Sequence, residues 1–258
     1  MTAWQALLLG IVQGVTEFLP ISSSGHLVIL QQVLNVQGDI FTFDIILHLA
    51  TLGAIIIFFG FSLLKVTRRE WFMIGVATIP AVLVGVLLKD LVESLFAHNT
   101  WVGIELMVTG LINFYIAYLL KKDTQLTEAE PTNTSLTVAK SFGIGIAQAI
   151  AIIPGISRSG STVAGALKMG LSRAEAFRFS FLLAIPALLG AGILEIPDVM
   201  KANPTSLPLV PILIGSLAAF VSGILSLRLF KYVIMHAQLQ WFGWYCLVVG
   251  AIAFVILR

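Results

Sequence analysis

The sequence is poor in charge. Only 11% of its 258 residues are Asp, Glu, Lys or Arg, and 58% are hydrophobic, whereas an average soluble domain is about 25% charged. A soluble core cannot bury so much apolar surface, so the composition predicts a protein for which the lipid bilayer serves as solvent. The net charge of +2 gives no indication of nucleic-acid binding, and we expect no nucleic-acid partner.

Cysteine and early basic residues are also scarce. The single cysteine, Cys246, excludes an intrachain disulfide and most thiolate metal sites. The first Lys or Arg is Lys65, whereas a cleavable signal peptide needs a positively charged start. We therefore expect the first hydrophobic stretch to belong to the mature protein.

Long apolar runs are present instead. Six stretches have the length of a transmembrane helix, which needs about 20 apolar residues, and tryptophans lie at several of their ends, as is typical of membrane interfaces. The expected spans are residues 41–60, 71–88, 101–120, 173–196, 207–230 and 241–257.

Two further apolar stretches, residues 3–36 and 138–171, are interrupted by polar sequence that contains glycine and proline. Each half is too short to cross a bilayer. Such segments are typical of re-entrant helical hairpins, which are tolerated where they are buried in protein or line a polar cavity. The alternative is that each stretch is one long kinked span.

The two interrupted stretches resemble each other. Residues 10–25 read GIVQGVTEFLPISSSG and residues 145–160 read GIAQAIAIIPGISRSG, and the spans follow the same spacing. We therefore predict one integral-membrane domain, 1–258, built from repeat one (1–120) and repeat two (138–258) with a linker at 121–137. Because each repeat has three spans, the second inserts upside down, which is the inverted-topology architecture.

Basic residues indicate the orientation, because cytoplasmic loops are enriched in Lys and Arg. If the six spans alternate, three basic loops, one of which is the linker, lie on one side, which we expect to be cytoplasmic. The first hairpin then enters from the outer side. The residues concerned are Lys65, Arg68, Arg69, Lys121, Lys122, Lys140, Arg228 and Lys231.

Polar residues gather around the first interruption. Gln13 and Glu17 are four residues apart and so share one face of a helix. A carboxylate within a membrane is costly and usually functional; the alternative is a helix-end glutamate that reaches an interface. Their oxygens could hold a divalent cation, because hard cations take oxygen ligands and share them with phosphates.

Each interruption is followed by a helix start rich in hydroxyl groups. A helix N-terminus suits an anion, and Arg158 adds a guanidinium to the second, so the pair predicts a phosphate site. Serines alone would more often be helix caps or packing groups. The expected phosphate-binding residues are Ser22, Ser24, Gly25, Ser157, Ser159, Gly160 and Thr162.

These groups fit phosphoryl chemistry. The hydroxyl of Ser23 can be a nucleophile and His26 can act as base or acid. Arg158 can neutralise developing phosphoryl charge. The residues leave open whether Ser23 or His26 attacks. Asp44 and His48, also four residues apart, either lie near the cavity mouth or cap a helix end.

At these residues the chain closely resembles the undecaprenyl-diphosphate phosphatases of the BacA/UppP family, which are associated with bacitracin resistance. It matches the family's (E/Q)xxxE motif at Gln13–Glu17, its Ser-Ser-x-Gly-His turn at Ser22–His26 and its PGxSRSxxT motif at Pro154–Thr162. The span pattern matches over the whole length. Three motifs in order within an inverted repeat are highly specific.

The resemblance implies an enzyme of the bacterial inner membrane that hydrolyses undecaprenyl diphosphate to undecaprenyl phosphate and inorganic phosphate. This reaction recycles the lipid carrier for cell-wall polymers. The family's catalytic residues map to Glu17, Ser23, His26 and Arg158, and its divalent-ion dependence suits Mg²⁺ or Ca²⁺ near Gln13 and Glu17. Family members act on the outer, periplasmic face and often form homodimers.

Two other hypotheses remain. Inverted repeats with broken helices are also transporter architecture, so a transporter or flippase of prenyl phosphate lipids is the alternative. The Ser-Gly-His and Ser-Arg elements are also found in type-2 phosphatidic acid phosphatases. Those enzymes need a second histidine soon after the Ser-Arg, and none follows Arg158 until His236, which disfavours this assignment.

Overall fold

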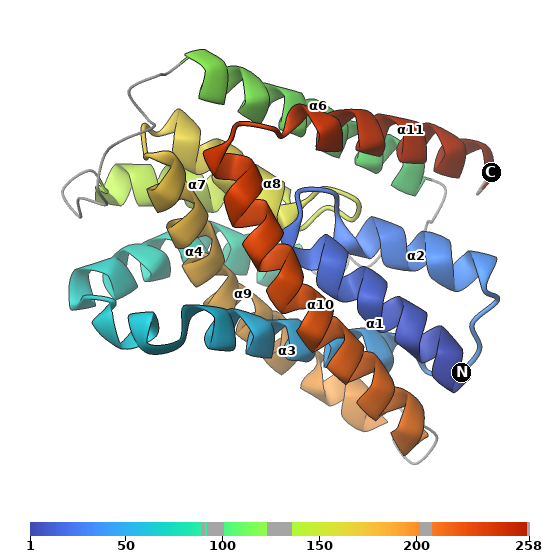
Figure 1. Ribbon diagram of the computed structural model, residues 1–258. Coiled ribbons are helices and arrows are strands. Elements are labelled where there is room, and N and C mark those ends of the chain that lie inside the picture. Colours follow the sequence, from blue (N-terminus) through green and yellow to red (C-terminus); the bar gives the residue numbers. More distant parts are fainter. Residues whose placement is uncertain (89–90, 92–100, 123–135, 202–207, 257–258) are drawn as a thin grey trace.

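The structure is a computed structural model that describes residues 1–88, 91, 101–122, 136–201 and 208–256. Within these ranges the regular elements are all helices (Figure 1). Most of the expected linker, 121–137, lies outside the described residues. The protein is therefore an all-α membrane protein, and two groups of helices build it.

The long helices confirm five of the six expected spans. Five segments are long and apolar enough to cross a membrane: α3 (Ile40–Phe59) extended by the 3-10 helix η1 (Gly60–Lys65), α4 (Arg68–Leu87), α6 (Val102–Lys122), α9 (Arg173–Lys201) and α10 (Leu209–Met235). The sixth expected span falls on α11 (Gln240–Ile256), an apolar helix of 17 residues.

The short helices form two pairs, each built from one interrupted stretch. The first pair is α1 (Ala3–Phe18) with α2 (Ser23–Val33), and the second is α7 (Val138–Ile150) with α8 (Arg158–Lys168). Between the helices the backbone takes the left-handed region at Ser22 (φ 68°) and at Gly155 (φ 75°). A continuous kinked helix is thereby excluded for both stretches.

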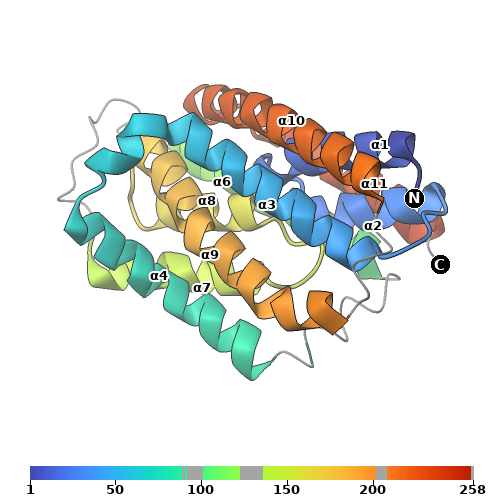
Figure 2. The same ribbon diagram turned by 90° about the horizontal axis from the view of Figure 1, so that it is seen from below.

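The helices pack in corresponding pairs. Helix α1 runs along α10, and α7 runs along α4 (Figure 2). Both contacts depend on a glycine: a Cβ on Gly10 would lie 2.2 Å from the carbonyl oxygen of Gly215, and one on Gly145 would lie 2.4 Å from that of Ala77. Small residues let membrane helices approach this closely, so these two glycines fix how α1 and α7 dock.

Two further pairs complete the bundle. Helix α6 lies beside α11, and α3 packs against α9 (Figure 1). Four phenylalanine rings lie where α1, α9 and α10 meet. Phe18 contacts Phe181 with ring centroids 5.7 Å apart, and Phe181 contacts Phe177 and Phe230 at 4.7 and 5.8 Å. This cluster anchors the end of α1, where the polar residues begin.

Candidate active site

Glu17 is the centre of the polar site. It lies in the last turn of α1 and is only 7% exposed. One carboxylate oxygen, Oε1, accepts a hydrogen bond from Nη2 of Arg158 at 2.5 Å. The other, Oε2, accepts one from the Ser23 hydroxyl at 2.7 Å and one from Nε2 of Gln13 at 3.1 Å. A carboxylate is disfavoured at a helix C-terminus, and these donors offset that cost.

The site joins the two helix pairs. Ser23 is the first residue of α2 and Arg158 is the first residue of α8, and both side chains bind the same carboxylate. The N-termini of both helices therefore meet at Glu17. Because each N-terminus carries a partial positive charge, the arrangement suits anionic groups.

Each of these helices begins with a serine cap. Ser22 accepts a hydrogen bond from the amide of Gly25 at 3.4 Å, and Ser157 accepts one from Gly160 at 3.2 Å. The cap leaves the amides of Ser23 and Arg158 without an acceptor among the residues that the structure describes. Ser22 and Ser157 thus shape the helix starts, and the amides remain available to an anion.

The two turns hold each other through their serines. The Ser24 hydroxyl accepts a hydrogen bond from the amide of Gly155 at 3.2 Å. In the reverse direction, the Ser159 hydroxyl donates to the carbonyl of Leu19 at 3.1 Å. These hydroxyls therefore fix the relative position of the turns.

Helix α6 supports both turns with two buried polar side chains. Thr109 donates to the carbonyl of Gly155 at 2.8 Å and accepts from the amide of Ser157 at 3.0 Å. Asn113 donates to the carbonyl of Pro20 at 2.6 Å. Backbone N–H and C=O groups in the turns, which have no helical partner, are thus hydrogen-bonded by side chains of a neighbouring span. A buried non-helical segment requires such partners.

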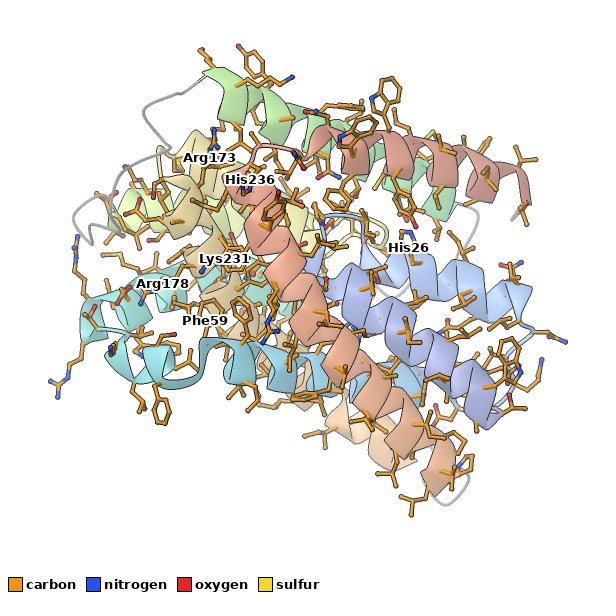
Figure 3. All side chains as sticks on the ribbon, viewed as in Figure 1. His26, Phe59, Arg173, Arg178, Lys231 and His236 are labelled. Carbon is orange, nitrogen blue, oxygen red and sulfur yellow. The ribbon has the colours of Figure 1, made fainter. Side chains whose placement is uncertain are left out.

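His26 follows Ser23 in the first turn of α2, and its two ring nitrogens bind groups other than Glu17. Its Nδ1 lies 2.7 Å from the carbonyl of Ser22, and its Nε2 lies 2.9 Å from the hydroxyl of Tyr245 on α11. The imidazole and the Tyr245 ring are stacked with centroids 5.6 Å apart (His26 is labelled in Figure 3). A carbonyl only accepts, so Nδ1 carries a proton, and in the neutral ring Nε2 accepts from Tyr245.

His48 joins the site from α3. Its Nε2 lies 3.7 Å from Oε2 of Glu17, and its Nδ1 lies 2.7 Å from the carbonyl of Asp44. The Asp44 carboxylate accepts both hydrogen bonds of the Gln31 amide, at 2.8 and 2.9 Å. Of the two sequence interpretations for this pair, a place beside the polar site fits His48, which is 3.7 Å from Glu17.

The expected metal ligands lie together. Oε1 of Gln13 is buried and has no hydrogen-bond partner among the described residues, and it belongs to the amide that binds Glu17. The described residues contain no group of three His, Cys, Asp or Glu that could hold a metal ion alone. Magnesium is commonly held by one or two protein oxygens with substrate phosphates, so the donor set fits a cation shared with a phosphate ligand.

Arg158 retains an unused donor. Its Nη1 is buried without a partner within the described part of the chain, while Nη2 is held by Glu17. A guanidinium presents its donors in a rigid fork that matches phosphate oxygens. With the free helix amides, the site can therefore bind a phosphate group directly beside the Ser23 hydroxyl.

The remaining predicted residues lie around this centre. Gly25 packs against Leu106, Gly160 packs against Pro20, and Thr162 donates to the carbonyl of Arg158 at 2.9 Å within α8. Tyr245 and Thr109 were not predicted, because they lie far from the motifs in sequence. The one sequence signal for Thr109 and Asn113 is that they are polar residues within an apolar span.

Comparison with known proteins agrees with the motifs. A family model described as "Bacitracin resistance protein BacA" matches residues 6–252. The chain is 38% identical to an undecaprenyl-diphosphatase of Carboxydothermus hydrogenoformans. The alignment covers 99% of this chain and 98% of that protein. An undecaprenyl-diphosphatase of Halothermothrix orenii is 36% identical over the same shares.

A third relative, undecaprenyl-diphosphatase 2 of Bacillus thuringiensis, is 34% identical and aligns with 97% of this chain and 96% of its own. The residues matched by the family model include Glu17, Ser23 and Arg158. The chain therefore belongs to the bacitracin resistance protein BacA family.

Proposed function

We propose that this protein hydrolyses undecaprenyl diphosphate to undecaprenyl phosphate and inorganic phosphate. One observation carries the proposal. Ser23 and Arg158 are the first residues of two helices, and both donate hydrogen bonds to the buried carboxylate of Glu17. The relatives named undecaprenyl-diphosphatase support the choice of substrate. By recycling a lipid carrier for cell-wall polymers, the activity would confer resistance to bacitracin.

In the proposed reaction Ser23 is the nucleophile. Its hydroxyl already donates to Glu17 at 2.7 Å, so the carboxylate can take the proton as Oγ attacks the terminal phosphorus. The bond from that phosphorus to the bridging oxygen breaks, and undecaprenyl phosphate leaves with the electron pair. Water then cleaves the phosphoserine, which releases inorganic phosphate and returns the proton to Ser23.

Arg158 and the helix amides stabilise the transferring group. The free Nη1 of Arg158 and the amides of Ser23 and Arg158 are donors fixed before the substrate arrives. Preorganised donors of this kind stabilise the charge of a phosphoryl transition state. His26, held by Tyr245, is proposed to exchange a proton with water or the departing phosphate.

A divalent cation, Mg²⁺ or Ca²⁺, is proposed to bind at Oε1 of Gln13 and the carboxylate of Glu17. The buried, unpartnered oxygen of Gln13, among the described residues, supports this site. When bound, the cation would neutralise charge on the diphosphate. Gln13 and Glu17 would hold it, and substrate oxygens would complete its ligands.

The finer architecture is also proposed. We infer an inverted-topology repeat with six spans, α11 being the sixth, and two re-entrant hairpins, α1–α2 and α7–α8. The corresponding packing of α1 on α10 and of α7 on α4 supports it, as do the reciprocal serine contacts of the turns. The protein would be a homodimer in the bacterial inner membrane, with the site open to the periplasmic side.

Phosphate release from undecaprenyl diphosphate tests the proposal. Purified full-length protein in detergent with Mg²⁺ or Ca²⁺ should release phosphate, and Glu17→Ala or Arg158→Ala should nearly abolish release. Glu70→Ala is the matched control, since Glu70 is also a buried carboxylate paired with an arginine, Arg178. Equal release by wild type and both site variants would overturn the site, and lipid movement in liposomes without hydrolysis would favour a flippase.

A further inference from the structure

A hollow with basic residues in its lining lies at the C-terminal end of α10, outside the candidate active site. It has a volume of about 400 Å³ and opens to the surface. Figure 3 shows Lys231 and His236 on this part of α10. The lining residues are Phe58, Arg228, Lys231, Tyr232, Met235 and His236; we call this hollow the α10 pocket.

The two cations of the α10 pocket are unpaired. Arg228 and Lys231 are exposed, and neither forms a hydrogen bond or ion pair with any residue in the described ranges. Other arginines nearby are used differently: Arg178 pairs with Glu70, and Arg173 donates to the carbonyls of Met235 and Leu120. No carboxylate lines the pocket, so its positive charge is uncompensated there.

Capping of α10 does not account for these cations. Basic residues often lie at helix C-termini because they bind the last free carbonyls. Here those carbonyls are already satisfied: Tyr232 by the amide of His236, Val233 by Gln238, Ile234 by Ala237, and Met235 by Arg173. The guanidinium and the ammonium are therefore left to bind an anion from outside the chain.

The surroundings of the pocket are those of a lipid headgroup. Leu225, Leu229 and Tyr232 are exposed and follow one another at helical spacing, so they form an apolar stripe that runs along α10 into the pocket. Tyr232 and Phe58 supply aromatic rings at its edge, as is typical of the membrane interface. An acyl chain can thus lie on the stripe while its headgroup reaches both cations.

We propose that the α10 pocket binds the phosphate group of an anionic membrane lipid in the leaflet at this end of the bundle. Arg228 and Lys231 bind the phosphate oxygens, and Tyr232 and Phe58 contact the glycerol and upper acyl chain. Basic pockets between transmembrane helices are suited to such headgroups. The proposal does not depend on the enzymatic activity.

Lipid retention by the full-length protein tests the proposal. Protein in detergent is mixed with phosphatidylglycerol, phosphatidylcholine or excess inorganic phosphate, and bound lipid is counted by native mass spectrometry. Each basic residue near an anionic surface contributes about 1 kcal/mol, so Arg228→Gln with Lys231→Gln, which removes two, should weaken phosphatidylglycerol binding about thirtyfold. Phosphatidylcholine should bind weakly to wild type and variant alike.

Lys65→Gln with Arg68→Gln is the matched control. Both residues are exposed, near the loop between η1 and α4, and outside the α10 pocket. The control should retain wild-type affinity and, like the pocket variant, wild-type unfolding temperature without lipid. The proposal would be overturned if the pocket variant retained as much phosphatidylglycerol as the wild type. It would also be overturned if the control lost as much of this lipid as the pocket variant. Displacement of the lipid by inorganic phosphate at matched concentration would assign the pocket to free phosphate and overturn the lipid assignment.

Discussion

Arg158 and Glu17 form a buried ion pair, with Nη2 of the arginine 2.5 Å from Oε1 of the glutamate, although 141 positions separate them in sequence. Removing one partner of a buried pair strands the other charge and costs about 3–5 kcal/mol. We expect Glu17→Leu and Arg158→Met each to lower the unfolding temperature in detergent. The double variant should recover part of the loss, because no charge is stranded.

Activity and stability should respond differently to Glu17→Leu, Arg158→Met and the double variant. All three variants should lose phosphate release by a factor of about 10³ or more, since the charge that stabilises the transferring group is gone. The pair Glu70→Leu and Arg178→Met serves as control, with a smaller loss of stability, because this ion pair is more exposed, and with retained activity. Additive destabilisation by the two site substitutions would contradict a coupled pair.

Ser23 and His26 should differ in their effects. Ser23→Ala removes the group that donates to Glu17, so we expect no turnover above background. His26→Ala should lower activity by a factor of about 10², as for loss of a general acid or base. Rapid acid quench during turnover should trap phosphate on the peptide that contains Ser23. In parallel samples quenched with base, which preserves phosphohistidine, a phosphate on His26 would instead identify the histidine as nucleophile.

Gln13 should affect the metal requirement. Gln13→Leu removes the amide oxygen that lacks a partner among the described residues and keeps a similar volume. Removal of divalent cations by chelation should stop wild-type turnover, and the variant should need a higher Mg²⁺ concentration for half-maximal activity. An unchanged Mg²⁺ dependence in Gln13→Leu would exclude this residue as a ligand.

Thr109 should stabilise the turns from α6. Thr109→Val loses two buried hydrogen bonds to the second turn, at Gly155 and Ser157, and leaving such groups unsatisfied costs about 1–3 kcal/mol each. Thr78→Val is the control, because among the described residues the Thr78 hydroxyl bonds only to a carbonyl of its own helix, that of Ile74. In detergent, the unfolding temperature should fall clearly for the first variant and little for the second. Equal falls would contradict the inference that Thr109 of α6 stabilises the turn.

Gly10 should be intolerant of a methyl group. In Gly10→Ala the Cβ would lie 2.2 Å from the backbone oxygen of Gly215, so α1 and α10 would have to move apart. Gly75→Ala is the control in α4, where no atom of the described residues lies within 4 Å of the added carbon and alanine has the better helix propensity. The first variant should unfold at lower temperature and the second should not; a neutral Gly10→Ala would show that the contact is loose.

Sequence reasoning predicted the helices well because their lengths are set by bilayer thickness and by the breaks at Pro20 and Pro154. It also predicted the Glu17 and Arg158 grouping, since the internal repeat relates the two turns. It could not predict that His26 contacts Tyr245, because no pattern relates residues 219 positions apart. Nor could it choose between the two interpretations of His48, which the packing of α3 near α1 decides.

The reciprocal serine contacts and the Glu17–Arg158 pair have a consequence for biogenesis. The first half of the chain is synthesised with a carboxylate whose counter-charge and turn partners come from residues 155–159. Until that segment emerges from the ribosome, Glu17 cannot pair with the guanidinium of Arg158, and the first turn lacks its hydrogen bonds to the second turn. The first three long helices, α3, α4 and α6, are therefore synthesised before the site can form. The site is completed late, when the turn at residues 155–159 contacts Glu17 and the first turn.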